Sequence, residues 1–279
     1  MDKEVSQAAN LPAQKELAKI PGAVRETKFD AWWVLVAIVI LLVIFLALVF
    51  PDPYLDLLRF VRRGLIVTIT ITFISFFLTL ILGLFGGLAR VSKNFILNGI
   101  STLYVEIIRG IPLLVQLIWW FFAFPALIRS FGAARGIPAL ANYVANEWLM
   151  AVVGLTICYG AYMSEIYRAG IQSIPVGQME AARSLGMTYF QAMRFVIIPQ
   201  AVRVILPPVG NEFTALLKDT SLVSVIAVSD LTRAGREFMS THYNPIETWN
   251  MVALLYLILT LFSSRVNAFI ERRLSVTQR

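Results

Sequence analysis

Six apolar runs, each close to the length of a membrane-spanning helix, constrain the fold of this 279-residue chain. About 20 apolar residues, rising roughly 1.5 Å each, cross a hydrocarbon core of about 30 Å. No water is available there to bond the backbone, so each run is expected to form a helix. The runs are 32–50, 64–88, 101–125, 148–166, 195–217 and 249–270. The sequence therefore predicts an all-α integral membrane protein with six transmembrane helices.

The composition agrees with a membrane protein and excludes several other classes. Hydrophobic residues make up 58% of the chain and charged residues 15%, whereas about one quarter of the residues in soluble domains are charged. The net charge of +7 is typical of basic cytoplasmic loops, and no interleaving of aromatic and basic residues indicates nucleic-acid binding. Cys158 and His242 are the only cysteine and histidine. The chain can therefore form neither an intrachain disulfide nor a His/Cys metal cluster.

The first apolar run follows a polar leader and lies apart from the others. We expect residues 1–31 to form a cytoplasmic tail, 32–50 an additional transmembrane helix, 64–270 the main transmembrane domain, and 271–279 a second cytoplasmic tail. A cleaved signal peptide is the alternative for the first run. A retained span is favoured, because the leader is long and contains acidic residues and no small-residue cleavage site follows the run.

Two apolar runs contain helix breakers. The third run has an early interruption at Gly110 and Pro112, and residues 128–147 are expected to connect it to the fourth run. Glu106 and Arg109 are three residues apart on one helical face and are expected to form an ion pair. Glu165 and Arg168 repeat this arrangement at the end of the fourth run.

The fifth run is interrupted by Pro199, Arg203, Pro207, Pro208 and Gly210. Proline lacks a backbone donor, so we expect a broken helix at this point. A broken helix is tolerated at membrane depth only where it is buried in protein or lines a polar cavity. The sequence therefore predicts that this segment does not face lipid throughout.

A polar segment between the fourth and fifth runs, residues 176–200, has helix signals of its own. Pro175 suits the start of a short helix, and Gly186 suits its end because glycine adopts a positive φ without strain. Thr188 and Gln191 then form the T-x-x-Q capping pattern of a second helix. The segment is therefore predicted to be a structured loop in water.

The first helix of this loop is expected to be amphipathic. Met179, Ala182 and Leu185 recur every three residues and form an apolar stripe, while Glu180 and Arg183 occupy the other side. An apolar stripe that faces water indicates a binding partner.

The loop resembles the EAA loop of bacterial ABC importer permeases. The residues that carry the resemblance are Glu180-Ala181-Ala182, Gly186, Val196, Ile198 and Pro199. The family has Ile and Leu at the last two apolar positions, and both departures conserve bulk and polarity. In the family this loop is the coupling helix that docks in a cleft of a separate ATPase subunit. The resemblance implies ATPase-coupling roles for Glu180, Ala181, Ala182 and Gly186; an ordinary interfacial hairpin is the alternative.

Three further blocks resemble the histidine/glutamine permease group, which serves importers of polar amino acids. The blocks are YVEIIRGIPLLVQ, GAYMSEIYRAGI and PQAVRVILPPVGNEFTALLKDTSL. They occur in the order found in the family, and the resemblance covers about residues 64–273. It implies a five-helix type-I ABC importer permease core at 64–270 with one extra N-terminal span.

The resemblance implies a permease subunit that translocates a polar amino acid by alternating access in the bacterial inner membrane, with both termini cytoplasmic. The chain has no phosphate loop of the form G-x-x-x-x-G-K-[ST], so ATP and Mg are expected in a separate ATPase subunit, with no cofactor in this chain. No large soluble domain captures substrate, which implies an extracytoplasmic amino-acid-binding protein. The other permease of the complex is a second copy or a related chain. No catalytic constellation indicates an enzyme.

A zwitterionic substrate needs an acceptor for its ammonium group and donors for its carboxylate, because unpaired charge is unfavourable at membrane depth. Polar residues that follow the expected break are candidates for its pathway: Asn211, Glu212, Lys218 and Asp219. The alternative is that they only stabilise the break and the turn after it.

The competing function is a self-contained ion-coupled transporter that uses Glu212 or Glu165 as its coupling site. Such transporters carry paired broken segments in two halves of the chain, and no such pair is evident in this sequence.

Overall fold

The computed structural model describes residues 31–275, and all secondary structure in that range is helical. Six helical stretches there are long and apolar enough to cross a membrane. They are Trp32–Val49, Pro51–Val91, Leu113–Arg135, Glu147–Gln172, Tyr189–Ile226 and Pro245–Arg273. The predicted all-α fold with six transmembrane helices is confirmed. The chain divides into two units, Met1–Ile38 and Val39–Arg279, and the helices from α3 onward belong to the second.

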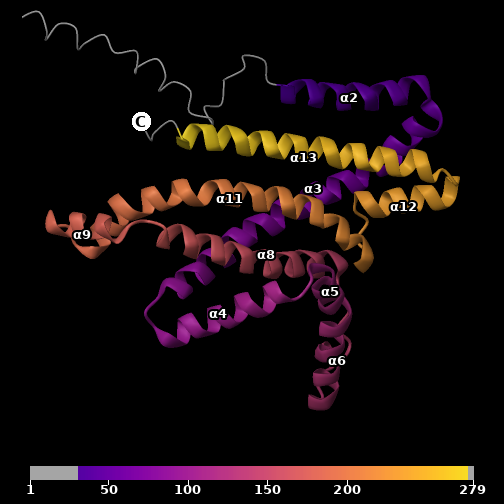
Figure 1. Cartoon of the computed structure of the whole chain (residues 1–279). Helices are drawn as coiled ribbons and strands as arrows, with labels where there is room; N and C mark the ends of the chain where they lie inside the picture. Colours follow the sequence, from indigo (N-terminus) through magenta and orange to yellow (C-terminus); the bar gives the residue numbers. More distant parts are fainter. Residues whose placement is uncertain (1–30, 276–279) are drawn as a thin grey trace, which may run out of the picture. The chain divides into compact units, whose positions relative to one another are not determined.

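Helix α2 (Ala31–Val49) corresponds to the first apolar run, and α3 (Pro51–Val91) extends the second run in both directions (Figure 1). Near the end of α2, Val43 and Leu46 pack against a buried cluster that α3 shares with later helices. The expected tail at 1–31 lies almost wholly outside the described residues, as do residues 276–279.

The third span differs from the predicted 101–125. Helix α4 (Phe95–Gly110) ends before Pro112, and α5 (Leu113–Ile118) begins after it. Pro112 has no N–H with which to continue α4, and its fixed φ suits the start of a new helix. The side-chain amide of Gln116 donates to two carbonyl oxygens at the end of α4, both at 2.8 Å. These bonds satisfy backbone carbonyl acceptors that the break in the helix leaves free. The membrane-spanning stretch continues from α5.

The segment expected to connect the third and fourth spans, 128–147, begins as helix. Helix α5 continues through a π-helical turn (Trp119–Ala123) into α6 (Phe124–Arg135). Gly136 then ends α6 with a φ of +64°, and only the short α7 (Pro138–Ala141) remains in the connection. The arginines in this segment lie in the last part of a helix rather than in a loop.

Helix α8 (Glu147–Gln172) is the fourth span and includes the predicted 148–166. It is the most buried of the six candidate spans, with 61% of its apolar window inside the structure. In Figure 1 it lies beside α3, α4 and α11, and contacts join it to each of these helices. The core of the second unit is therefore built around α8.

The predicted break in the fifth run is wrong, because α11 (Ile198–Asp219) continues through Pro207 and Pro208. Prolines are tolerated within membrane helices that pack against other helices, and α11 packs against α8 and the last span, α13. Asn267 of the last span donates its side-chain N–H to the carbonyl oxygen of Gly210. This bond ties α11 to the last span directly after the prolines.

Irregular turns occur at the ends of α11 instead of its middle. A π-helical turn (Met193–Ile197) precedes it, where Pro199 offers no N–H to the carbonyl four residues earlier. A 3₁₀ helix (Thr220–Ile226) follows it.

Helix α12 (Leu231–His242) is short, and α13 (Pro245–Ser275) is the last span, which extends beyond the predicted 249–270. The buried Asp230 caps α12 by accepting backbone N–H bonds at 3.0 and 3.1 Å, and it also accepts from the hydroxyl of Tyr256 on α13 at 3.2 Å. Burial raises the pKa of the Asp230 carboxyl, and these hydrogen bonds oppose the rise. Helix α12 is thus fixed to α13 at its start.

Glycines bring α3 and α8 into backbone contact. A Cβ placed on Gly83 would lie 2.5 Å from the side chain of Met163. A Cβ on Gly87 would lie 2.7 Å from the Cβ of Tyr167 and 3.0 Å from the carbonyl oxygen of Ser164. Because backbone atoms cannot move aside as the end of a side chain can, this helix pair depends on glycine.

We expect Gly87→Ala to destabilise the protein by about 1–3 kcal/mol, because the added methyl group overpacks the contact of α3 with α8. The matched control is Gly99→Ala, which lies in α4 with open space around its Cα. Alanine there should be neutral or stabilise the helix by up to about 1 kcal/mol. Thermal unfolding in detergent, followed by tryptophan fluorescence, measures both. Equal midpoints for the two variants would contradict the packing described here.

Candidate coupling loop and polar faces of α11

The polar loop folds into two short helices, α9 (Val176–Ser184) and α10 (Tyr189–Ala192). Gly186 lies between them with a φ of +84°. At the start of α10, the hydroxyl of Thr188 accepts from the N–H of Gln191 at 3.3 Å, and the Gln191 side chain accepts from the N–H of Thr188 at 2.8 Å. The expected helices, the glycine turn and the capping box are all present.

The residues of the apolar stripe expected on α9 differ in burial. Ala182 is buried, and α9 packs against the π-helical turn before α11. Leu185 is 81% exposed. The other large apolar side chains exposed on the two helices are those of Val176, Tyr189 and Phe190. Exposed apolar residues gathered on one projecting segment indicate a protein-binding surface.

The charged residues of α9 also point outward. Glu180 and Ala181 are exposed. The backbone carbonyl of Glu180 accepts from the hydroxyl of Ser184 at 3.0 Å. Within residues 31–275 its carboxylate has no hydrogen bond or ion pair. This carboxylate is therefore free to meet a partner.

The loop is joined to α11, and α11 is packed tightly against α8. The side chain of Gln200 in α11 donates to the Gln178 side chain of α9 at 3.2 Å. At the end of α8, Gly170 lies so close to α11 that a Cβ would be 2.2 Å from a side-chain carbon of Ile205. A displacement of α9 would therefore move α8 and α11 together.

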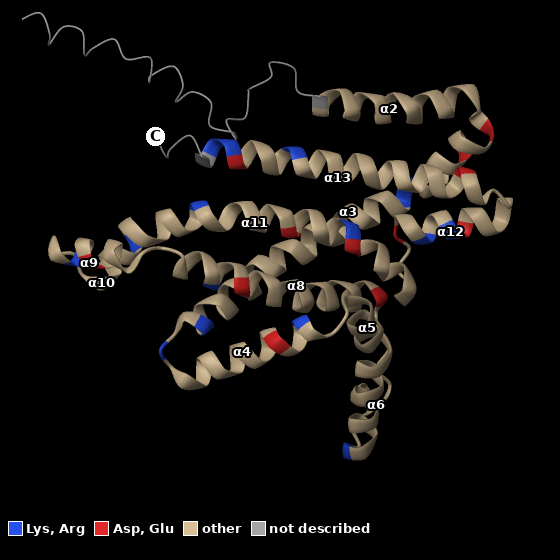
Figure 2. Ribbon diagram, in the orientation of Figure 1, with Lys and Arg blue, Asp and Glu red and all other residues tan. Residues whose placement is uncertain are grey.

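An ion cluster joins the last turns of α8 to the end of α3. Figure 2 shows positions of both charges along these helices. The Glu165 carboxylate pairs with Arg168, as predicted, and also with Arg90 on α3. Arg168 donates in addition to the side chain of Gln172. Glu165 is thus engaged by arginines of two helices, which favours a structural role over the coupling site of an ion-driven transporter.

The ion pair expected between Glu106 and Arg109 is wrong for the part of the chain that the structure describes. The guanidinium of Arg109 lies over the ring of Tyr162 on α8, 5.1 Å from its centroid. It is also close enough to act electrostatically on Glu212. Residues from distant elements thus replace the local partner that the spacing suggested.

The candidate pathway residues lie on two faces of α11. Glu212 and Asp219 are half-buried and seven residues apart, and the Asp219 carboxylate accepts from the hydroxyl of Tyr159 on α8 at 2.7 Å. Asn211 and Lys218 are exposed, also seven residues apart, and line a cavity between α11 and α13. Residues seven apart share a face of a helix, whereas adjacent residues are turned by about 100°.

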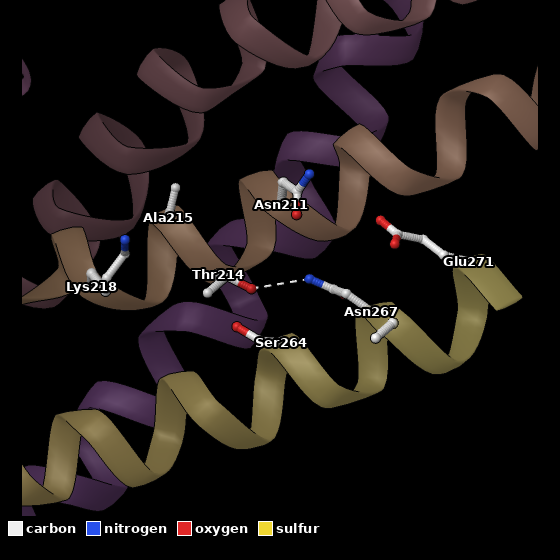
Figure 3. A pocket seen from close by; sticks show the side chains of 8 residues that line it. Asn211, Thr214, Ala215, Lys218, Ser264, Asn267 and Glu271 are labelled. Atoms are coloured by element: carbon white, nitrogen blue, oxygen red, sulfur yellow. Dashed lines mark hydrogen bonds between the residues drawn. The ribbon is translucent and has the colours of Figure 1, made fainter. Parts of the chain in front are cut away.

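The cavity between α11 and α13 has a volume of about 340 Å³. Figure 3 shows Lys218 and Glu271 toward its two ends, with Thr214 and Asn267 hydrogen-bonded at 3.1 Å between them. Its lining residues are Asn211, Thr214, Ala215, Lys218, Ser264, Asn267, Ala268 and Glu271. The residues from α13 were missed in the sequence, since nothing there indicates which helix faces α11.

Residues of the types that bind metal ions make other contacts in this structure. In the described range no group of three or more His, Cys, Asp or Glu side chains could hold a metal ion. Cys158 is buried and lies 3.6 Å from the side-chain amide of Gln116. His242 stacks on the ring of Phe238 at the end of α12.

Comparisons with known proteins agree with this geometry. A family described as "Binding-protein-dependent transport system inner membrane component" matches residues 79–276. The glutamine transport system permease protein of Escherichia coli (strain K12) is 39% identical over 197 residues, which are 71% of this chain and 84% of that protein. The L-cystine transport system permease protein of Bacillus subtilis (strain 168) is 40% identical over 212 residues, 76% of this chain and 85% of that protein.

A solved structure is also similar. The crystal structure of an amino acid ABC transporter with histidines is 39% identical to this chain and has a TM-score of 0.69. The match covers 77% of this chain and 94% of that one. The resemblance therefore extends from local motifs to the arrangement of the helices.

Gly186→Ala should loosen the turn between α9 and α10, because a residue with a Cβ is less stable by about 1–2 kcal/mol in the left-handed conformation. No atom lies within 4 Å of the added group, so strain alone acts. The control is Gly177→Ala, which is equally open but has no positive φ. Trypsin cleavage after Arg183 and Arg194 should accelerate about 5- to 30-fold in Gly186→Ala only. Equal rates in both variants would show that the turn does not depend on glycine.

Proposed function

Because the chain belongs to the family of binding-protein-dependent transport system inner membrane components, we propose that it carries a polar amino acid into the cell as the permease subunit of an ABC importer. The observation that carries this conclusion is the loop of α9 and α10. It presents an unpaired carboxylate and exposed apolar side chains, and it is anchored to two spans. Such a loop suits the transfer of movement from a partner protein to the membrane.

The partner of the loop is a separate ATPase subunit, which binds ATP and Mg. Glu180, Ala181, Ala182 and Gly186 serve the coupling. Ala182 holds α9 against the start of α11, Gly186 sets the angle between the two short helices, and Glu180 faces the ATPase. Leu185 and the neighbouring exposed apolar side chains enter a cleft of the ATPase.

The loop acts as a rigid lever on the spans. When two ATPase subunits close on ATP, α9 is displaced, and α8 and α11 move with it because Gly170 and Ile205 are in close contact. The pairing of Glu165 with Arg90 passes the same movement to α3. Alternating access follows from this concerted shift of three spans.

The other components and the orientation follow from the same proposal. A second permease, either a copy of this chain or a related one, completes the pathway. An extracytoplasmic amino-acid-binding protein delivers the substrate. In the bacterial inner membrane, the loop and both termini are cytoplasmic. The end of α11 that leads into α12 then faces the extracytoplasmic side.

Glu212 and Asp219 are the better pathway candidates of the four residues on α11. Both carboxylates can accept the ammonium group of an amino acid, and the guanidinium of Arg109 on α4, which acts electrostatically on Glu212, can bind its carboxylate. Groups of opposite charge suit a zwitterion. Asn211 and Lys218 lie on the other face, where Asn267 and Glu271 offer further polar groups.

Reconstitution tests the proposed function. The permease, its ATPase and the binding protein encoded beside it are placed in proteoliposomes, and uptake of radiolabelled glutamine, cystine, arginine and histidine is measured. We expect uptake of at least one of them to require ATP and all three proteins. Uptake by the permease alone, driven by a sodium or proton gradient, would instead establish the ion-coupled alternative.

Glu212→Gln should reduce uptake by at least about tenfold, because a charge-assisted hydrogen bond of about 1.5–3 kcal/mol to the substrate is lost. Glu106→Gln is the matched control, since Glu106 is exposed on α4 and forms no ion pair in the described range. It should transport normally. Assembly of each variant with the ATPase is measured by gel filtration. Normal rate and apparent affinity in Glu212→Gln would reassign this residue to local structure.

A further inference from the structure

The carboxylate of Asp219, the last residue of α11, is held by a single side chain. Its Oδ2 atom accepts from the hydroxyl of Tyr159 on α8 at 2.7 Å. Within residues 31–275 this carboxylate makes no other hydrogen bond and no ion pair. Lys218 precedes it in the chain but lines the cavity toward α13 instead. The second carboxylate oxygen of Asp219 therefore has no donor among the described residues.

One hydrogen bond leaves this carboxylate incompletely satisfied for its position. Asp219 is half-buried and lies within the candidate span Tyr189–Ile226. A charged side chain in such a segment is unfavourable unless it faces a protein interior or an aqueous cavity and meets further polar or charged groups. An ionised carboxylate has about four acceptor positions, and Tyr159 occupies one of them. The remaining positions suit a cationic donor that comes from outside the described chain.

A buried phenol needs a hydrogen-bond acceptor, but this need alone does not explain the contact of Tyr159 with Asp219. Tyr104 on α4 shows how the fold meets the same need without a charge. Its hydroxyl donates to the backbone carbonyl oxygen of Ile157 on α8, also at 2.7 Å. A carboxylate in place of a carbonyl adds a cost of desolvation and no packing. We therefore read the contact in the other direction, with Tyr159 serving Asp219.

Tyr159 is itself fixed in one place. It is buried and belongs to a core cluster that includes Leu155 of α8 and Val223 of the 3₁₀ helix. Because this 3₁₀ helix directly follows Asp219, the tyrosine and the chain beyond the carboxylate share one core. A donor that packing holds in place keeps its acceptor in one orientation, which reduces the entropy lost when a ligand binds.

The next turn of α8 holds a group of the opposite charge. The ring centroid of Tyr162 lies 6.2 Å from that of Tyr159. The guanidinium of Arg109 on α4 lies over the Tyr162 ring, 5.1 Å from its centroid. Two tyrosines of α8, three residues apart on one face, thus contact a carboxylate from α11 and a guanidinium from α4. A zwitterion needs an acceptor and a donor of these kinds.

We propose that Tyr159 is a positioning residue of the translocation pathway, which orients the Asp219 carboxylate so that its free oxygen accepts the ammonium group of the transported amino acid. The inference rests on the proposed function. Tyr159 does not touch the substrate and acts only through Asp219. Its hydroxyl stays on Oδ2 while the ammonium group donates to Oδ1, so binding breaks no existing hydrogen bond of this carboxylate.

The test measures substrate binding to the permease–ATPase complex in detergent, without the binding protein, whose own affinity would mask this site. The probe is the one of glutamine, cystine, arginine and histidine that the reconstituted wild-type importer takes up fastest. The thermal unfolding midpoint of the complex against probe concentration gives the dissociation constant. Tyr159→Phe should raise this constant at least about fivefold, because Asp219 loses its fixed orientation. The matched control Tyr104→Phe removes a hydroxyl bond of equal length to α8 and should leave the constant unchanged.

A double-mutant cycle separates positioning from packing. Asp219→Asn should raise the dissociation constant at least about tenfold, because it removes the charge that meets the ammonium group. Adding Tyr159→Phe to Asp219→Asn should then change the constant by less than about twofold, since the tyrosine acts through the carboxylate. Gel filtration and basal ATP hydrolysis establish that each variant assembles with the ATPase.

An unchanged constant in Tyr159→Phe, or an equal rise in Tyr104→Phe, would overturn the proposal. So would independent losses that add up in the double mutant. If Tyr159→Phe did not assemble, a normal constant in Asp219→Asn would overturn it alone. Stabilisation of the complex by sodium ions and not by the probe would assign the free oxygen to a metal cation. ATP-driven uptake without any midpoint shift would refute this inference only, whereas a wild-type importer without uptake would refute the proposed function itself.

Discussion

The close contact of α8 with its two neighbours is the constraint on which the rest of the structure depends. Gly83 and Gly87 bring α3 against one side of α8, and Gly170 admits Ile205 of α11 on the other. Side chains larger than hydrogen at these positions would separate the helices and loosen the packing between them. Because α8 and α11 also flank the loop of α9 and α10, the same contacts that build the core determine how a movement of the loop reaches the membrane.

Features that depend on local chemistry could be predicted from the sequence, and features that depend on neighbours could not. The apolar runs required helices, and the turn at Gly186 and the capping box of α10 follow from residues within a few positions of one another. The continuous course of α11 past Pro207 and Pro208 could not be predicted in this way. It depends on the packing of α11 against α8 and α13, which the local sequence does not show.

The candidate pathway shows the same division. Polar residues of α11 could be recognised as candidates because they stand out in an apolar run. The sequence spacing already indicated that they lie on two faces of the helix, since Glu212 and Asp219 are seven residues apart. Their partners were not: Arg109 and Tyr159 belong to α4 and α8, and no pattern in those helices identifies which side faces α11. A local rule instead predicted a pair between Arg109 and Glu106.

The left-handed residues of the described chain are accommodated in two ways. Gly136 and Gly186 occupy such positions without strain, as expected where the turn alone matters. Ala227 and Tyr243 occupy them with strain, on either side of a helix whose buried face is firmly packed. A well-packed helix can hold such turns in place, because the surrounding contacts outweigh the strain of one residue. By this argument the turn at Gly186 is free of strain because of its residue type, whereas the turn at Tyr243 is held by the packing of the helix before it.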